Sequence, residues 1–111
     1  MAVNPAATQI DGRPCYPDVA AVPGPVDGLM IAAPPDQGDE LVTQAAARGI
    51  RQIWFHRSFG EGSVSEIAVA ECQAAGMNCI VGGCPLMYCQ PVDIFHRGMC
   101  WWLRRGGRVP V

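Results

Sequence analysis

Short apolar runs alternate with longer amphipathic segments along this chain. The runs at residues 26–33, 50–55 and 77–81 are rich in branched and aromatic side chains, which is typical of buried strands. Apolar residues recur at helical spacing over residues 36–48 and 63–76, so these segments are predicted as helices. A helical crossover of this length joins parallel strands, and the pattern therefore predicts two βαβ units that share one strand. We expect an α/β fold with a doubly wound parallel sheet.

Local signals mark the ends of the two helices. Ser63 and Glu66 have the spacing of a capping box, which predicts that Ser63 caps the second helix. Asp36 or Asp39 is expected to cap the first helix. Two glycines follow the helices where a residue without Cβ is favoured: Gly49 and Gly76.

The N-terminal stretch has a different character. Residues 1–4 read as the end of a strand that Pro5 terminates, and Asn4 is expected to bond its own backbone in the following turn. Residues 6–17 are rich in glycine and proline and are predicted as a loop.

A third helix is predicted over residues 92–105. Pro91 suits its start, and Arg104 and Arg105 lie at its C-terminal end, where positive charge is favourable. Its expected apolar face consists of Ile94, Phe95, Met99, Trp102 and Leu103. Together the elements predict one domain over residues 1–111, with residues 91–105 as a C-terminal helix.

Composition narrows the class of protein. Half of the 111 residues are hydrophobic, which suffices for one core, and the net charge of −2 offers no field for nucleic acid. No apolar run approaches the ~20 residues that span a bilayer, and the first residues lack the basic start of a signal peptide. We expect a cytoplasmic protein in which the six cysteines are reduced thiols.

Candidate chemistry gathers at the carboxyl ends of the predicted strands, where open α/β sheets bind ligands. Four segments are expected to converge there: residues 4–5, 32–35, 56–62 and 82–85. The loop after Phe55 is the best phosphate candidate, because it carries Arg57 and leads into a helix N-terminus, whereas Glu61 opposes an anion. The alternative is an ordinary solvated loop. His56 is expected to be a hydrogen-bonding residue rather than a catalyst.

A metal site is the competing hypothesis. Cys84, Cys89, His96 and Cys100 could form a zinc set of three sulfurs and one imidazole, with His96 and Cys100 on the same face of the predicted helix. Their spacing matches no standard zinc finger, and buried free thiols are the alternative. The pair Trp101 and Trp102 beside the C-terminal arginines would suit a membrane-surface helix, but covering the sheet or a partner subunit is the simpler use.

Several stretches together resemble a known family, the small CoA-binding Rossmann-fold proteins related to the CoA-binding domain of succinyl-CoA synthetase. The matching stretches follow the same order along the chain: Val3-Asn4-Pro5, residues 12–17, the strand ending in Ala33-Pro34-Pro35, Ile53-Trp54-Phe55 with the loop after it, and Cys84-Pro85. The tail from Pro91 to Arg97 resembles the tail of one bacterial branch.

The resemblance implies a Rossmann-like parallel sheet of strand order 3-2-1-4-5 and coenzyme A as the ligand. The residues that it implies for CoA binding are Asn4, Pro5, Ala33, Pro34, Pro35, His56, Arg57, Ser58, Phe59 and Gly60. This chain begins at the second strand of the family, so it is expected to lack the first strand, the phosphate loop and the first helix. The absent strand is central in that order, and its two neighbours are expected to keep unpaired edges.

The resemblance therefore predicts non-catalytic binding of CoA or acyl-CoA at the carboxyl ends of the strands, without metal or catalytic residues. A zinc-stabilised interaction module is the first alternative. The second is an enzyme that acts on a CoA thioester through His56 or Cys84. The expected partner is a small molecule rather than nucleic acid or a membrane, and a homo-oligomer stays open.

Overall fold

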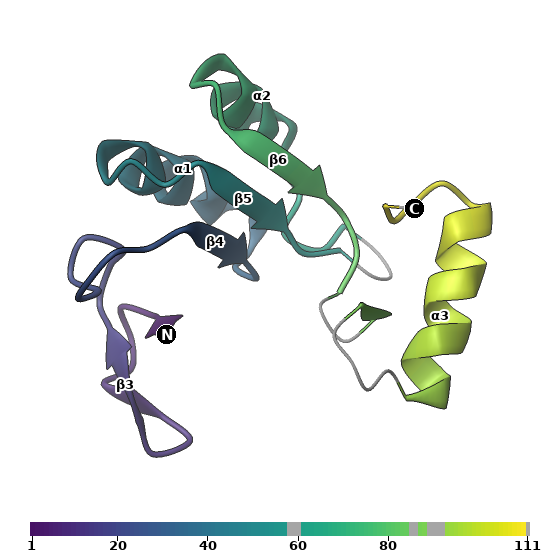
Figure 1. Ribbon diagram of the computed structural model, residues 1–111, viewed down its shortest axis with the longest axis horizontal. Coiled ribbons are helices and arrows are strands. Elements are labelled where there is room, and N and C mark those ends of the chain that lie inside the picture. Colours follow the sequence, from purple (N-terminus) through teal and green to yellow (C-terminus); the bar gives the residue numbers. More distant parts are fainter. Residues whose placement is uncertain (58–60, 85–86, 89–92, 111) are drawn as a thin grey trace.

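The computed structural model describes residues 1–57, 61–84, 87–88 and 93–110 (Figure 1). Its strands and helices follow the alternation that the hydrophobic pattern predicts. The strands are β1 (Ala2–Val3), β2 (Gln9–Ile10), β3 (Arg13–Tyr16), β4 (Gly28–Ile31), β5 (Gln52–Phe55) and β6 (Asn78–Val81). The helices are α1 (Gly38–Ala47), preceded by the 3₁₀ turn η1 (Pro35–Gln37), α2 (Glu66–Ala74) and α3 (Ile94–Arg105).

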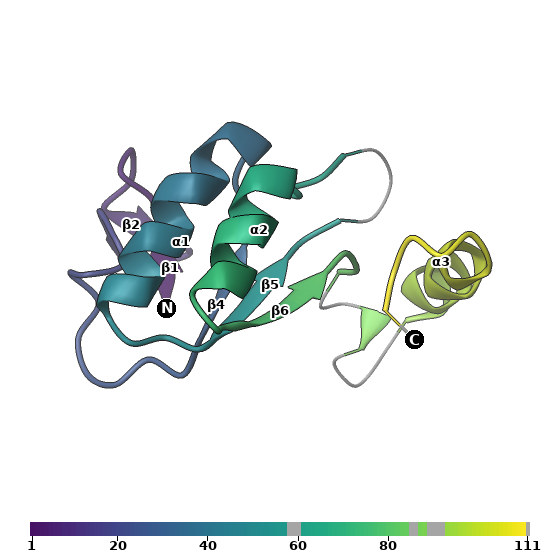
Figure 2. The ribbon, with the colours of Figure 1, turned by 90° about the horizontal axis from the view of Figure 1, so that it is seen from above.

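The central sheet has the order β4-β5-β6, and both pairs are parallel. This confirms the two predicted βαβ units that share one strand. α1 follows β4 and α2 follows β5, and Figure 2 shows both helices on the same side of the sheet. Because the strands are parallel and in register, their carboxyl ends lie at one edge.

A second small sheet precedes the central one. β3 pairs with β1 in parallel and with β2 in an antiparallel hairpin, so the prediction of a plain loop over residues 6–17 was wrong. Asp11 and Gly12 form the two-residue turn of this hairpin, both with positive φ, of 51° and 72°. An Asp-Gly pair is a strong hairpin signal, and it outweighs the surrounding Gly and Pro content. Asn4 closes its turn as predicted, because its Oδ1 accepts a hydrogen bond from the Ala6 N–H at 2.9 Å.

No strand of the described ranges joins the two sheets. In the family order 3-2-1-4-5, residues 26–33 would be the third strand and would pair with the second strand, which is β1 here. In the structure β3 pairs with β1 instead, and β4 (within residues 26–33) pairs with β5. β1 is thus an edge strand of the small sheet and β4 an edge strand of the central sheet, and the two are not paired with each other. This is the arrangement expected when a central strand is absent from a Rossmann-like sheet.

The main apolar cluster lies between the central sheet and the helices α1 and α2. Phe55, Ile31 and Ile53 are its largest strand residues, all at most 1% exposed. Gly38, at the start of α1, allows the helices to approach, since a Cβ there would lie 3.1 Å from the Cβ of Ala68 on α2. The cluster consists of Val19, Ile31, Val42, Ala45, Ile50, Ile53, Phe55, Ala68, Cys72 and Met77.

The helix caps differ from two of the predictions. α2 is capped by Ser65, whose side chain accepts a hydrogen bond from the Ala68 N–H, and not by Ser63, which is buried. α1 has no side-chain cap, because it continues directly from η1, and its N-cap position is Gln37. The C-terminal signals are confirmed, since Gly49 and Gly76 adopt positive φ just after the helices.

The cysteines and the third helix also bring corrections. Cys72 and Cys79 form a disulfide between α2 and β6, so the expectation that all six cysteines are reduced was wrong for this pair. Their position follows from the packing of α2 on β6, which brings the two Cα atoms to 6.7 Å. In α3, Leu103 is buried as predicted, but Ile94, Phe95 and Trp102 of the predicted apolar face are exposed. Pro91 lies outside the described residues.

Candidate functional site

The carboxyl ends of β4, β5 and β6 are held together by backbone hydrogen bonds. The His56 N–H donates to the Ile31 carbonyl at 2.9 Å, and the Gly82 N–H donates to the Phe55 carbonyl at 2.9 Å. One step further, Arg57 and Gly83 exchange backbone bonds of 3.1 and 2.6 Å. The segments after the three strands therefore converge, as the parallel pattern predicts.

A groove of about 710 Å³ opens at this edge, between the N-terminal ends of α1 and α2. The segments after β4 and β5 and the first turns of both helices supply its walls. The lining residues are Pro35, Asp36, Asp39, Arg57, Glu61, Val64, Ser65, Glu66 and Ile67. Its volume falls within the range of ~300–1,000 Å³ that small-molecule sites occupy.

The charge of the groove is strongly negative. Asp36, Asp39, Glu61 and Glu66 face one cation of the lining, Arg57. The free N–H groups at helix starts attract anions, but carboxylates at these starts cancel that attraction. Two polar atoms of the lining, Asp39 Oδ1 and Arg57 Nε, are buried and have no hydrogen-bond partner among the described residues. The groove therefore favours neutral or positively charged parts of a ligand over a phosphate.

The arginine of the groove is also tied to the C-terminal segment. One terminal nitrogen of Arg57 donates to the Arg108 carbonyl at 3.1 Å. Gly82 lies against the same carbonyl, because a Cβ on Gly82 would stand 2.5 Å from it. The positive φ of 91° at Gly82 and this close approach both require glycine.

The predicted site residues fall into three groups. Pro35 and Arg57 line the groove, and Ala33, Pro34 and His56 belong to the two segments that lead to it. Asn4 and Pro5 follow β1 in the other small sheet and do not line the groove. Ser58, Phe59 and Gly60 lie outside the described residues.

Sequence reasoning did not assign the acidic lining to a site. Glu61 was noted as opposing an anion, and Asp36 and Asp39 as candidate caps of the first helix. The signal that could have found the groove was their position at or just before two neighbouring helix starts. Two helices that follow adjacent parallel strands begin at the same edge of the sheet, so the carboxylates of their first turns must gather there.

The residues of the zinc alternative are placed only in part. Cys84 is half-buried, Cys100 is buried, and Cys89 lies outside the described residues. His96 Nδ1 lies 2.5 Å from Asp93 Oδ1. Among the residues that the structure describes, no three His, Cys, Asp or Glu side chains form a group that could hold a metal ion.

Comparison with known proteins decides the family. Residues 1–90 match the model of a family described as "CoA binding domain". The chain belongs to this CoA-binding domain family. The match covers β1 to β6 and ends before α3.

Solved structures with the same fold support this assignment. A conserved hypothetical protein from Pyrococcus furiosus is 30% identical, with a TM-score of 0.65 over 76% of this chain and 69% of its own. A hypothetical protein from Pyrococcus horikoshii OT3 is 26% identical, with a TM-score of 0.68 over 75% of this chain. The chain spans only 56% of the length of that protein.

A larger enzyme contains the same fold. The dinucleotide-forming acetyl-coenzyme A synthetase 1 of Ca. Korarchaeum cryptofilum is 24% identical, with a TM-score of 0.58. The match covers 72% of this chain and 18% of the synthetase, so the likeness concerns one domain of that enzyme and its fold alone.

The part of the chain that the structure describes contains no helix long and apolar enough to cross a membrane. The cytoplasmic location stays a prediction.

Proposed function

We propose that this chain binds coenzyme A or an acyl-CoA at the carboxyl ends of β4, β5 and β6 and catalyses no reaction. The membership of residues 1–90 in the CoA-binding domain family carries the proposal. The groove at that edge supports it, because it has the volume of a ligand site and lies where open parallel sheets bind nucleotides.

The charges of the groove suggest which part of CoA it would take. CoA carries phosphates at one end and an uncharged pantetheine chain at the other. Four carboxylates in the lining would repel the phosphates. The amide N–H groups of pantetheine can instead donate to carboxylate oxygens, and its apolar groups can contact Val64 and Ile67, without electrostatic repulsion. We therefore assign the pantetheine part to the groove and the phosphates to its rim near Arg57.

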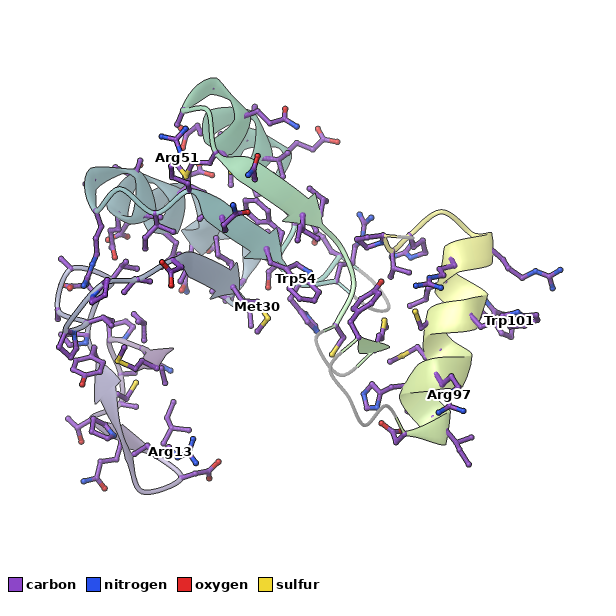
Figure 3. The ribbon with its side chains drawn as sticks, viewed as in Figure 1. Arg13, Met30, Arg51, Trp54, Arg97 and Trp101 are labelled. Atoms are coloured by element: carbon purple, nitrogen blue, oxygen red, sulfur yellow. A yellow bond between two sulfur atoms is a disulfide. The ribbon has the colours of Figure 1, made fainter. Side chains whose placement is uncertain are left out.

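Calorimetric titration with CoA tests the binding. Arg57→Ala should weaken CoA binding about tenfold, which corresponds to about 1.4 kcal/mol, because the rim loses its cation. Arg51→Ala is the matched control, since Arg51 precedes β5 at the opposite end of the strand (Figure 3). Pantetheine without phosphates should bind both variants equally. Absence of heat with CoA at high micromolar concentration, or equal losses in the two variants, would contradict the proposal.

Thioester turnover tests the absence of catalysis. We expect acetyl-CoA incubated with the chain to release free thiol no faster than in buffer. His56→Ala and Cys84→Ala should then behave like the unaltered chain. Turnover that either substitution abolishes would instead support the enzyme hypothesis.

A further inference from the structure

Among the residues that the structure describes, α1 and α2 cover one face of the central sheet and no helix covers the other (Figure 2). Met30, Trp54 and Ile80 stand in one register row across β4, β5 and β6. Because successive side chains of a strand point to opposite faces, this row lies on the face opposite Ile31, Ile53 and Phe55, which belong to the main cluster. Met30 and Ile80 are 43% and 44% exposed, and Figure 3 shows Met30 and Trp54 side by side on their strands. Parallel sheets normally have both faces covered, because both carry apolar side chains. The row Met30-Trp54-Ile80 is called the open sheet face below.

α3 also has an apolar side that this molecule does not use. Its inner side, with Cys100 and Leu103, packs on Met87 and Val109. Its outer side carries Ile94, Phe95, Trp101 and Trp102, which are 85%, 71%, 60% and 70% exposed. In Figure 3, Trp101 points away from the rest of the molecule. At 100° per residue these four side chains share one half of the helix, which is called the outer face of α3 below.

The outer face cannot reach the open sheet face of its own chain without breaking contacts. The segment after α3 is tied to the sheet edge by the bond from Arg57 to the Arg108 carbonyl. The hydroxyl of Tyr88 donates to the Pro110 carbonyl at 2.9 Å, and the Tyr88 ring lies 5.8 Å from that of Trp54. These contacts hold α3 beyond the strand ends with its inner side toward the molecule (Figure 1).

We propose that the outer face of α3 packs on the open sheet face of a second copy of this chain, and that the two copies exchange helices reciprocally. The sizes match, since a helix of 12 residues is about 18 Å long and three strands span about 10 Å between the outer two. A reciprocal pair is also a closed two-fold assembly, which leaves neither surface exposed.

The area and charge favour this partner. Each aromatic side chain can bury roughly 150–250 Å². Phe95, Trp101 and Trp102 of both copies would therefore bury about 900–1,500 Å², around the ~1,000 Å² that a specific interface needs. Residues 93–111 carry four arginines and one carboxylate, a net charge of +3, whereas residues 1–92 carry four arginines and nine carboxylates, a net charge of −5. The α3 end of one copy is therefore attracted to the body of another.

Sedimentation velocity of the purified chain tests the proposal. The unaltered chain should be a dimer at micromolar concentration. Trp102→Glu and Met30→Glu should each raise the dissociation constant at least tenfold, because each removes an apolar contact twice per dimer. Ile10→Glu, a change at an exposed apolar residue of β2, is the control and should leave the dimer intact. Circular dichroism checks folding, and Trp101→Ser and Ile80→Thr provide milder variants of the two surfaces.

Mixing the variants distinguishes reciprocal exchange from other dimers. An equal mixture of Trp102→Glu and Met30→Glu chains keeps one intact contact per heterodimer, so association should be partly restored. A monomeric unaltered chain, or a dimer that tolerates either surface change, would overturn the proposal. So would a mixture without restored association. A monomer whose tryptophan fluorescence shifts on vesicles containing phosphatidylserine would point instead to a lipid surface as the partner of α3. None of these outcomes depends on whether the chain binds CoA.

Discussion

The cluster beneath α1 and α2 and the cluster beneath α3 differ in how far apart their residues lie in the sequence. The main cluster gathers buried side chains from residues 19–77, drawn from two strands, two helices and three connections. The α3 cluster has Met87, Cys100, Leu103 and Val109 as its buried members among the described residues, all within one short stretch. The first cluster therefore requires the whole fold, whereas the second holds one helix to the segments on either side of it.

The difference also explains which surfaces remain exposed. Within the described part of the chain, the main cluster uses one face of the sheet and the other face stays uncovered. In the same way, the α3 cluster uses one side of the helix and the other side stays exposed. A helix with two apolar sides and a sheet with one uncovered face are both incomplete alone. The predictions below separate the two clusters, beginning with the largest expected effect.

Truncating the largest buried side chain should destabilise more of the molecule in the main cluster than in the α3 cluster. Phe55→Ala should lower the free energy of unfolding by about 3–5 kcal/mol, because Phe55 is 0% exposed at the centre of the main cluster. Leu103→Ala should lower the free energy of unfolding by about 2–3 kcal/mol, and the loss of protection should be located mostly in α3. Urea denaturation gives the first value, and amide hydrogen exchange locates the second. Equal loss of protection in β5 and in α3 for Leu103→Ala would show that the clusters unfold together.

Loss of the α2 cap should destabilise the main cluster less than truncation of a buried side chain does. Ser65→Ala should lower the free energy of unfolding by about 1 kcal/mol, because the Ala68 N–H loses the oxygen that it donates to at 3.3 Å. Ser65→Asp should retain the stability, since aspartate caps equally well. Urea denaturation of both variants makes the measurement. An unchanged midpoint for Ser65→Ala would contradict the assignment of the cap.

The cap of α3 should make that helix sensitive to acid. The His96 N–H donates to the side chain of Asp93, and this bond lowers the pKa of the Asp93 carboxyl. A lowered folded-state pKa contributes stability that is present above the unfolded pKa of about 3.9 and is lost as the pH falls through the folded value. We expect α3 to fray below about pH 4, before β5 loses protection. Asp93→Asn should remove the pH dependence while keeping a capping oxygen, and helix content and hydrogen exchange followed against pH check both outcomes.

Local signals in the sequence predicted much of the fold because they act through neighbouring residues. The apolar runs located β4, β5 and β6, and the glycines after α1 and α2 located the helix ends. The hairpin of β2 and β3 was missed although its Asp11-Gly12 turn is a local signal. Ser63 and Ser65 show the limit of such signals, because both are serines before a helix and only the packing of α2 decides which one caps it.

The candidate site was less predictable. Arg57 and Pro35 were identified from strand ends and from the resemblance, and both line the groove. Its acidic character depends on two helix starts that are far apart in the sequence and adjacent in space. The disulfide between Cys72 and Cys79 depends likewise on the packing of α2 against β6.

The sequence by itself determined the strand and helix alternation, the parallel direction of the strands and the family. Periodicity, helix-end signals and the order of motifs depend only on positions along the chain. Only the tertiary structure decided how β1, β2 and β3 pair, which carboxylates share the groove and which side of α3 is buried. These depend on free energies of packing between distant residues, and no local pattern specifies them when a sheet has an open edge and an open face.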